Sequence, residues 1–461
     1  MYLEKFIIKN FRGINDISLT FNKGLNVLIG ENNAGKTAII DALRICLSYG
    51  NQRRDIYISQ SDFHLDKNDI SDSADNIEFH LHFHIDNPQE TGWFNDLLSV
   101  QEDGTQDLQL HFKFYLDDND RVKYKVWGGT NEGQAIAPEV LFLIYHVHLD
   151  ALRDAEQFLR PIRGNRLGQL YTNIQIDPDV EKDQEKKKEL AKKVRSAVDR
   201  DVEWIGHVEK GKEKINEHLK ETSFSNKQHK VDISFLPFEF NRLVDNLKIQ
   251  MPLYSDELLE GDPTKQKYFE LHQNGLGYNN LIYTATVLGD LKQRKQKQKE
   301  TYAALLIEEP EAHLHPQLQL NLFDFLKQTN NQDNSQLFIT THSPTLTSKV
   351  PLDNLIHLSK NNRAINLNQC FENRETIIVE VEDEEAFEDD ALNRKKQLER
   401  YIDVTKSQLF FSKGVLFVEG ISEELLVPVF AQIINHRLED YKIELLNADG
   451  TSFYPFIYLF N

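Results

Sequence analysis

The segment best equipped for chemistry is the glycine-rich stretch Gly30–Thr37, which reads G-E-N-N-A-G-K-T. It follows an apolar, strand-like run at 25–29 and precedes a helix-like repeat at 38–47. A loop in this setting turns backbone N–H groups toward phosphate oxygens, and the helix N-terminus favours negative charge. We therefore predict an ATP site with Mg²⁺, in which Lys36 reaches the β- and γ-phosphates and the Thr37 hydroxyl binds the metal. The predicted nucleotide-binding residues are Gly30, Asn32, Asn33, Ala34, Gly35, Lys36, Thr37 and Ala38.

Two further segments could complete this site. In Leu305–Pro310 an apolar run ends in two adjacent acids, which is typical of a Walker B strand. We predict that Glu308 orients Mg²⁺ and that Glu309 polarises the attacking water as general base. A second apolar run ends at Thr340–Pro344, where His342 is predicted to contact the γ-phosphate and to sense its hydrolysis.

A separate carboxylate lies near the end of the sequence. An apolar run at 414–418 leads into Glu419, Gly420 and a helix-like stretch from Ser422. A carboxylate exposed at the carboxyl end of a strand can hold Mg²⁺. Glu419 is therefore a candidate metal ligand.

The elements that must position these residues indicate an α/β fold. The apolar runs at 25–29, 303–307 and 337–340 are continuous, as in strands buried on both faces of a sheet. The stretches 77–84 and 108–116 alternate, as in half-buried antiparallel strands. Their histidines follow the period of two, and we expect them to face solvent rather than to bind a metal.

The middle of the chain differs in composition. Charged residues dominate 181–220, with apolar residues every three to four positions, which predicts long amphipathic helices inserted into the first domain. This pattern fits both a solvated helical hairpin and a dimerisation arm, and we favour the dimerisation arm. The acidic stretch 380–390 is predicted to be a linker.

Length and composition exclude several classes of protein. The chain has 461 residues, with 53 Lys and Arg against 73 Asp and Glu, for a net charge of −20. Any DNA contact must therefore use local basic patches, such as the run 294–299. Two cysteines cannot build a disulfide framework, the start has no signal-peptide pattern, and no apolar run approaches the ~20 residues of a membrane helix. We expect a cytoplasmic bacterial protein rather than a secreted, membrane-spanning or disordered one.

Four segments together resemble an ABC-type ATPase of the SMC-related group: Ile8–Ile14, the P-loop, Glu308–Pro316 and Thr341–Pro344. The resemblance implies that Arg12 approaches the nucleotide phosphates and that Gln60 stands in the Q-loop. It also implies a signature loop before the Walker B strand. The best match is 274–280, although this stretch lacks the usual Ser-Gly-Gly motif. Gly275 and Gly277 would then contact the γ-phosphate bound by a second subunit, so the ATPase would act as a homodimer or a higher homo-oligomer.

The stretch 398–424 resembles the opening of a Toprim domain. An SMC-like ATPase followed by this junction is similar to the OLD (overcoming lysogenization defect) family, which includes Gabija-like and retron-associated defence nucleases. The resemblance implies DNA cleavage with two metals, Mg²⁺ or Mn²⁺, held by a strand-end Glu, a Glu four residues later and a later Asp-x-Asp. Glu419 and Glu423 match the first two ligands, but no Asp-x-Asp follows them. We expect an incomplete Toprim domain, from truncation or a split gene. Residues 1–461 alone should then bind or hydrolyse ATP without cutting DNA, and only the intact protein should be an endonuclease.

The predicted fold is thus α/β: an ABC/SMC-type P-loop ATPase with an inserted helical dimerisation region, followed by an incomplete Toprim α/β domain. The predicted segments are 1–150 (ATPase with Walker A), 151–235 (helical insertion), 236–375 (ATPase with signature loop, Walker B and His switch), 376–405 (acidic linker and helix) and 406–461 (Toprim, N-terminal part).

Two functions fit these observations, and a third does not. The leading one is an ATP-regulated, metal-dependent endonuclease that acts on double-stranded DNA in anti-phage defence. The alternative is an ATP-gated sensor or scaffold that controls a partner toxin or nuclease, a second protein of the defence system. A DNA-repair clamp of the SMC type would need a long coiled coil, and the insertion at 181–220 is too short for one.

Overall fold

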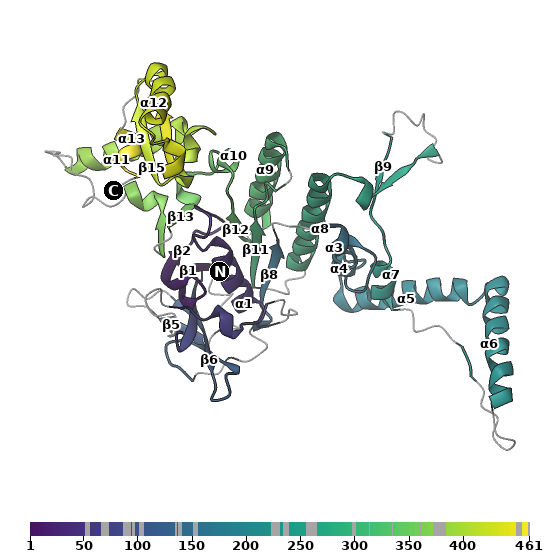
Figure 1. The fold of residues 1–461 in the computed structure, drawn as a ribbon. Helices are drawn as coiled ribbons and strands as arrows, with labels where there is room; N and C mark the ends of the chain where they lie inside the picture. Colours follow the sequence, from purple (N-terminus) through teal and green to yellow (C-terminus); the bar gives the residue numbers. More distant parts are fainter. Residues whose placement is uncertain are drawn as a thin grey trace. The chain divides into compact units, whose positions relative to one another are not determined.

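The computed structural model describes residues 1–50, 56–65, 73–85, 94, 97–100, 106–133, 136, 141–150, 155–222, 231–233, 239–254, 265–296, 301–312, 314–333, 335–359, 362–371, 384–448 and 454–459 (Figure 1). The chain divides into two compact units. The first comprises Met1–Arg153 and Gln298–Asn461, and the second comprises Asp154–Lys297. In the described part of the chain, no helix combines the length and the apolar character needed to cross a membrane.

The first unit is built on a six-stranded sheet with the order β14-β13-β3-β12-β11-β8. Its strands are β3 (Leu25–Gly30), β8 (Ile144–Leu149), β11 (Tyr302–Glu308), β12 (Gln336–Thr340), β13 (Leu355–Ser359) and β14 (Arg363–Asn366). All pairs are parallel except β13 with β14. Every residue of β3, β11 and β12 is buried, which confirms the strands predicted from their continuous apolar runs.

Helices connect these strands. After β3 comes α1 (Lys36–Leu47), whose buried residues include Ile39, Ala42, Leu43 and Cys46. After β11 comes α9 (Pro316–Asp333), and after β12 come the short α10 (Pro344–Thr347) and η7 (Leu352–Asn354). The predicted order of strand, P-loop and helix is therefore confirmed, and the P-loop, Glu309 and His342 each follow a buried strand.

A second, antiparallel sheet has the order β2-β1-β4-β6-β5, with β7 paired to β6. Its strands are β1 (Tyr2–Phe11), β2 (Ile14–Thr20), β4 (Asn76–His84), β5 (Leu98–Val100), β6 (Gln106–Leu116) and β7 (Val122–Gly128). The alternating stretches 77–84 and 108–116 pair with each other, as expected of half-buried strands. Their apolar side chains enter the same core as α1 and the parallel sheet.

The histidines of these strands are less exposed than predicted. His80 and His82 are half-buried and His111 is buried, because β4 and β6 are neighbours and Trp127 stacks on His111 with ring centroids 5.2 Å apart. Nδ1 of His80 lies 2.8 Å from Nδ1 of His111. Among the described residues, no group of three or more His, Cys, Asp or Glu side chains could hold a metal ion.

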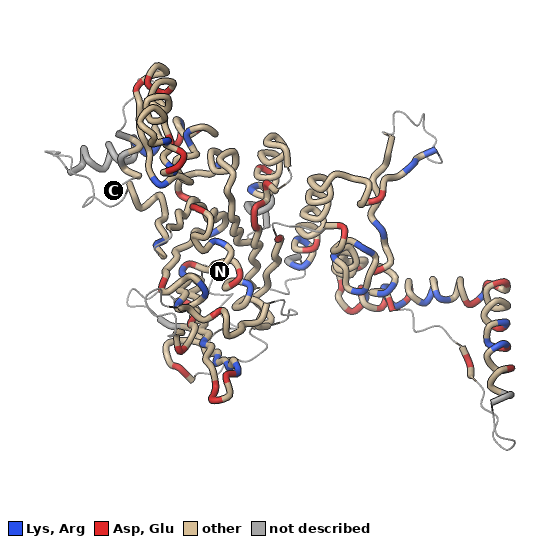
Figure 2. The backbone as a smooth tube through the Cα atoms, viewed as in Figure 1, with Lys and Arg blue, Asp and Glu red and all other residues tan. Residues whose placement is uncertain are grey.

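The second unit is largely helical. It contains α3 (Ala155–Leu159), α4 (Arg166–Asn173), α5 (Val180–Val198), α6 (Val202–Thr222), α7 (Phe240–Asp245), the hairpin β9 (Gln250–Pro252) and β10 (Tyr268–Glu270), η6 (Leu271–Gln273) and α8 (Leu276–Gln296). The two long helices predicted from 181–220 are α5 and α6, along which acidic and basic residues are interspersed (Figure 2). Their exposed apolar side chains include Leu190, Val194, Val202 and Ile205. This compact unit extends beyond the predicted insertion 151–235, and the domain boundaries stay a prediction.

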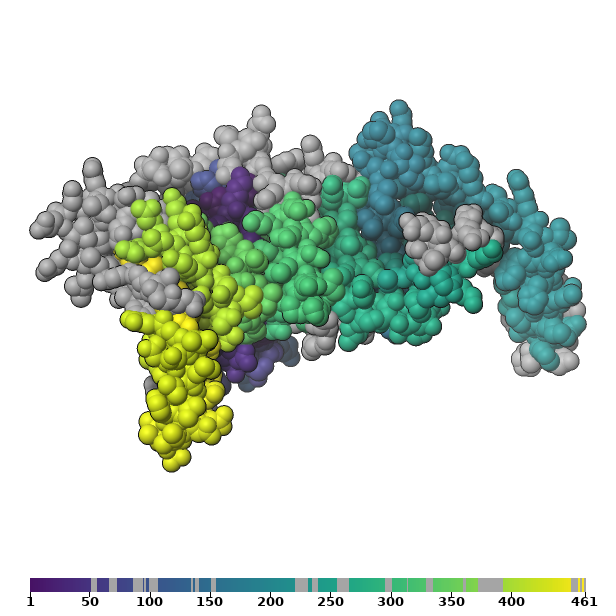
Figure 3. Space-filling view, turned by 90° about the horizontal axis from the view of Figure 1, so that it is seen from above, coloured from purple at the N-terminus to yellow at the C-terminus, as the bar shows by residue number. Residues whose placement is uncertain are grey.

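The C-terminal part of the first unit contains η8 (Leu367–Phe371), α11 (Glu384–Tyr401), η10 (Lys406–Phe411), β15 (Gly414–Val418), α12 (Ile421–Ile433), η11 (Leu438–Tyr441), β16 (Ile443–Asn447) and α13 (Tyr454–Ile457). The segment 376–405, predicted as an acidic linker and a helix, contains α11, which begins at Glu384 within the acidic stretch 380–390; residues 380–383 lie outside the described residues, and the linker stays a prediction. Strands β15 and β16 pair in parallel. The C-terminal part of the chain, yellow in Figure 3, includes α12, whose large apolar side chains are exposed.

Candidate ATP site and Toprim carboxylates

The P-loop, Glu308, Glu309 and His342 meet at the carboxyl ends of neighbouring strands of the parallel sheet. The strand register aligns Leu28 of β3 with Thr340 of β12, and Thr340 with Glu308 of β11. The P-loop starts two residues after Leu28, and His342 comes two residues after Thr340. Since ligands of open parallel sheets bind beyond the carboxyl ends of the strands, this edge is the candidate site.

The P-loop has the backbone that a phosphate cradle requires. Gly30, Asn33 and Gly35 have φ values of 140°, 63° and 97°, in the region that favours glycine. A Cβ atom at Gly30 would collide with the carbonyl oxygen of Leu358, so the strand must begin its turn with glycine. Among the other predicted ligands, Asn32, Asn33 and Thr37 are exposed, Ala38 is half-buried and Ala34 is buried.

Lys36 is buried at the centre of this loop. Its Nζ atom donates to the carbonyl oxygens of Gly30 at 2.7 Å and Glu31 at 2.9 Å. Burial lowers the pKa of Lys36 to about 8. The nearby carboxylates of Glu309 and Glu311 act in the other direction and raise it. A bound phosphate would favour the charged ammonium, which is the role that the sequence assigns to this lysine.

Glu308 is held by a histidine that sequence reasoning missed. Its carboxylate is buried, and Oε1 lies 2.8 Å from Nε2 of His148, near the end of the neighbouring strand β8. A carboxylate fixed by a second side chain keeps its orientation toward a metal. The only signal in the sequence was a histidine in an apolar strand, which is also typical of an ordinary core position.

Glu309 and His342 lie close to each other at the edge of the sheet. The backbone of Glu309 has a φ of 41°, and its N–H donates to the carbonyl oxygen of Thr340 at 2.9 Å. Oε1 of Glu309 lies 3.8 Å from Nε2 of His342. The pKa of His342 is lowered by burial and by the charge of Lys36, which favours the neutral imidazole.

Glu311 is a second residue that the sequence analysis did not single out. Its Oε1 atom accepts from the Thr341 hydroxyl at 2.7 Å and from the His342 backbone N–H at 2.9 Å. Burial raises the pKa of this carboxyl. Glu311 therefore ties the Walker B loop to the loop that carries His342.

Arg12 and Gln60 are held by protein groups. The Arg12 guanidinium lies 2.6 Å from Oδ2 of Asp41 on α1 and 2.8 Å from Oδ1 of Asp62. Gln60 begins η1 (Gln60–Asp62), and its amide donates to the Asp120 carbonyl oxygen at 2.6 Å. The ion pair with Asp41 anchors Arg12 to the helix that follows the P-loop, whereas the Gln60 amide is engaged by another loop.

The donor set at this edge fits Mg²⁺. The exposed Thr37 hydroxyl and the Glu308 carboxylate are hard oxygen ligands, and nucleotide phosphates and water supply the remaining ligands in sites of this kind. The two glycines of the candidate signature loop belong to the second unit: Gly275 is exposed just before α8, and Gly277 lies in its first turn.

The Toprim carboxylates lie around the start of α12. Glu419 is exposed directly after β15, and Glu423 is exposed in the first turn of α12. Oε2 of Glu423 accepts from the Gly420 N–H at 2.8 Å, while the neighbouring Glu424 accepts from the Asn447 amide at 2.8 Å. The predicted strand, turn and helix are confirmed.

Comparison with known protein families agrees with this geometry. The model of the AAA ATPase domain family matches residues 1–119 and 153–347, which is more than half of the chain. The model described as "Overcoming lysogenization defect protein-like, TOPRIM domain" matches residues 410–461. The chain belongs to the AAA ATPase domain family and carries an OLD-like TOPRIM domain. We refer to residues 410–461 below as the TOPRIM segment.

Individual relatives carry related names. Endonuclease GajA of Bacillus cereus is 31% identical over 267 residues, which are 51% of this chain and 37% of that protein. OLD nuclease of Thermus scotoductus is 26% identical over 92% of this chain and 72% of that protein. A solved SMC head domain of Pyrococcus furiosus, bound to the C-terminal domain of ScpA, is 17% identical with a TM-score of 0.43, over 80% of this chain and 98% of that one. The match to the first relative thus spans about a third of its length.

Proposed function

We propose that this protein is an ATP-regulated, metal-dependent DNA endonuclease of anti-phage defence that acts in the bacterial cytoplasm. The observation that carries the proposal is the meeting of Lys36, Glu308, Glu309 and His342 at the carboxyl edge of one parallel sheet. The OLD-like TOPRIM domain and the relatives named nucleases support the DNA-cleaving part.

The residues of the ATPase domain have distinct roles in this proposal. Lys36 and the P-loop N–H groups hold the triphosphate, and Thr37 and Glu308 hold Mg²⁺, which would neutralise charge on the β- and γ-phosphates. Glu309 accepts a proton from the attacking water. His342, held in place through Glu311, contacts the γ-phosphate and signals its loss.

The TOPRIM segment supplies Glu419 and Glu423 for the divalent ions of DNA cleavage. Two-metal cleavage stabilises both the attacking and the leaving oxygen of the phosphodiester, and it needs several carboxylates. The protein has a net charge of −20, which repels DNA overall, so local basic patches would have to bind the DNA phosphates. Within the candidate run 294–299, the Arg294 guanidinium is already engaged by Asp290 at 3.0 Å, and the side chains of 295–299 lie outside the described residues.

We propose a homodimer as the active form. The glycines at the start of α8 would complete the ATP site of the second subunit, and the exposed apolar side chains of α5 and α6 support a contact between subunits. Sedimentation that finds only monomer at micromolar concentration, with and without ATP, would contradict this part of the proposal.

A plasmid assay tests the proposed function. Supercoiled plasmid is incubated with the intact gene product and Mg²⁺ or Mn²⁺, with and without ATP. We expect metal-dependent nicking that responds to ATP, loss of nicking in Glu419→Gln, and loss of the ATP response in Lys36→Ala. Asp440→Asn, in the same segment, serves as the matched control. Nicking that persists in Glu419→Gln would assign cleavage to other residues.

One observation favours the alternative function, an ATP-gated sensor or scaffold for a partner protein. Helix α12 exposes Ile421, Leu425 and Ile433 by 67–70%. Large exposed apolar patches often mark protein interfaces. Intact ATP hydrolysis without any nicking under all metal conditions would favour this alternative.

A further inference from the structure

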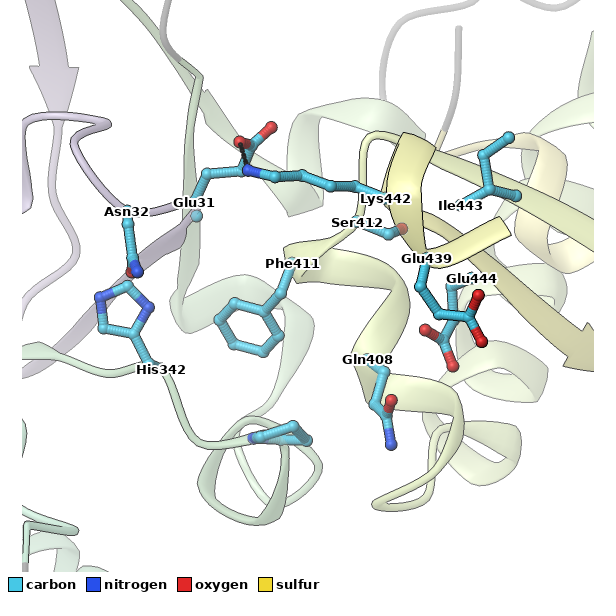
Figure 4. Close-up of a pocket in the computed structure, with 12 residues that line it drawn as sticks. Glu31, Asn32, His342, Gln408, Phe411, Ser412, Glu439, Lys442, Ile443 and Glu444 are labelled. Atoms are coloured by element: carbon cyan, nitrogen blue, oxygen red, sulfur yellow. Dashed lines mark hydrogen bonds and ion pairs between the residues drawn. The ribbon is translucent and has the colours of Figure 1, made fainter. Parts of the chain in front are cut away.

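A cavity of about 440 Å³ lies between the P-loop and the TOPRIM segment (Figure 4). The ATPase domain contributes Glu31, Asn32 and His342 to its walls, and the TOPRIM segment contributes Phe411 and Lys442. These residues face one another across the cavity in Figure 4. Because the γ-phosphate is the end of ATP predicted to reach His342, the cavity borders the γ-phosphate end of the site.

The TOPRIM side of the cavity is anchored at the His342 loop. The Ser407 hydroxyl, in η10, donates to the carbonyl oxygen of Pro344 at 2.8 Å, and Ser407 is fully buried. On β13, Nε2 of His357 lies 3.2 Å from the carbonyl oxygen of Phe410. The turn that leads into β15 is therefore fixed to the segment that directly follows His342.

The side chain of Lys442 reaches across the cavity to the P-loop. It stands between η11 and β16 with a φ of 56°, and its Nζ atom lies 3.1 Å from Oε2 of Glu31. The Glu31 side chain is 19% exposed and that of Lys442 is 52% exposed. Three of the described lining residues, Glu31, Glu439 and Glu444, bear carboxylates, and Lys442 bears an ammonium group.

The carboxylate of Glu31 would by itself disfavour the binding of a triphosphate. Glu31 is the second residue of the P-loop, and its carboxylate lines the same cavity as His342, so it would repel a γ-phosphate that reached the cavity. The ammonium group of Lys442, at 3.1 Å, offsets this negative charge. The TOPRIM segment thus brings a positive charge to the P-loop side of the cavity.

We propose that Lys442 is a positioning residue of the ATP site, which acts by neutralising Glu31 and so favours the triphosphate over the diphosphate. The inference rests on the proposed ATP binding. Because coupling between two sites is reciprocal, a bound triphosphate must also favour the docked position of η10 and β16. ATP would thereby hold the TOPRIM segment against the ATPase domain.

Calorimetric titration with Mg·AMP-PNP and Mg·ADP tests the proposal on the 461-residue chain. A partly exposed ion pair contributes little, so we expect Lys442→Gln to weaken AMP-PNP binding about three-fold and Lys442→Glu about ten-fold. ADP binding should change by less than about two-fold, because ADP lacks the γ-phosphate. The double variant Glu31→Gln/Lys442→Gln should bind AMP-PNP like the wild type. Lys413→Gln, which removes a nearby exposed lysine of the same segment outside the cavity, should have no effect.

Hydrogen exchange gives an independent readout. AMP-PNP should slow exchange of the backbone amides in 406–412 and 438–447 in the wild type and not in Lys442→Glu. Unchanged AMP-PNP affinity in Lys442→Gln would overturn the inference, and so would a double variant as weak as Lys442→Gln. If the wild-type chain itself fails to bind AMP-PNP, the proposed ATP binding fails instead.

Discussion

Nε2 of His148 lies 2.8 Å from Oε1 of Glu308, and both side chains are about nine-tenths buried. The two residues stand on neighbouring parallel strands, β8 and β11. A carboxylate held by a second side chain keeps a fixed orientation, which favours metal binding. His148 therefore contacts the residue that we propose as the Mg²⁺ ligand.

Substitution of His148 should therefore weaken metal binding more than nucleotide binding. We expect His148→Ala to raise the Mg²⁺ concentration for half-maximal ATP hydrolysis by about ten-fold, with partial recovery in His148→Gln, whose amide can still donate. A Mg²⁺ titration of the hydrolysis rate checks this. His315→Ala, an exposed histidine near α9, is the control, and an unchanged Mg²⁺ requirement in His148→Ala would contradict the assigned role.

Glu311 should matter as the hydrogen-bond acceptor of the His342 loop. Glu311→Gln keeps an acceptor oxygen and should be tolerated, whereas Glu311→Ala leaves two donors in the His342 loop without their acceptor. We expect Glu311→Ala to lower the free energy of unfolding by about 1–3 kcal/mol and the hydrolysis rate at least about ten-fold. Urea unfolding and a steady-state ATPase assay measure both quantities. A wild-type rate in Glu311→Ala would show that the His342 loop is held by other contacts.

The antiparallel sheet should be destabilised by mild acid. Burial lowers the pKa of His111 to about 4, below the usual value near 6.5, and it lowers the pKa values of His80 and His82 as well. Between these pH values the unfolded chain takes up a proton that the folded chain rejects, so stability falls as the pH drops. We expect the free energy of unfolding to fall by about 1–2 kcal/mol between pH 7 and pH 5 because of His111.

Urea unfolding followed by tryptophan fluorescence measures this loss, since Trp127 stacks on His111. The pH-dependent loss should be smaller in His111→Gln, even if that variant is less stable at pH 7. His315→Gln should keep the full loss. Equal pH dependence in the wild type and His111→Gln would rule out His111 as the cause.

Local motifs were predictable from the sequence because a few adjacent residues define them. The P-loop, the acids after β11 and the turn after β15 each lie where a buried strand ends, and the apolar runs were visible without any tertiary information. The left-handed backbone positions at Gly30 and Gly35 follow from the same short segment.

The partners of these motifs were not predictable, because strand order decides them. His148 and Glu308 are 160 residues apart in the sequence, and Lys442 and Glu31 are 411 residues apart. Only the placement of β8 beside β11, and of β16 near the P-loop, brings them together. The histidines of β4 and β6 were judged by their period alone, which could not reveal that neighbouring strands and Trp127 bury them.

ATP turnover by Glu309→Gln tests the central claim most directly. The variant keeps Lys36, Thr37 and Glu308, so it should bind Mg·ATP with wild-type affinity while its single-turnover hydrolysis rate falls at least about 100-fold. Lys36→Ala should lose binding altogether. Hydrolysis by Glu309→Gln at the wild-type rate, or unchanged ATP affinity in Lys36→Ala, would contradict the assignment of this sheet edge as the ATPase site.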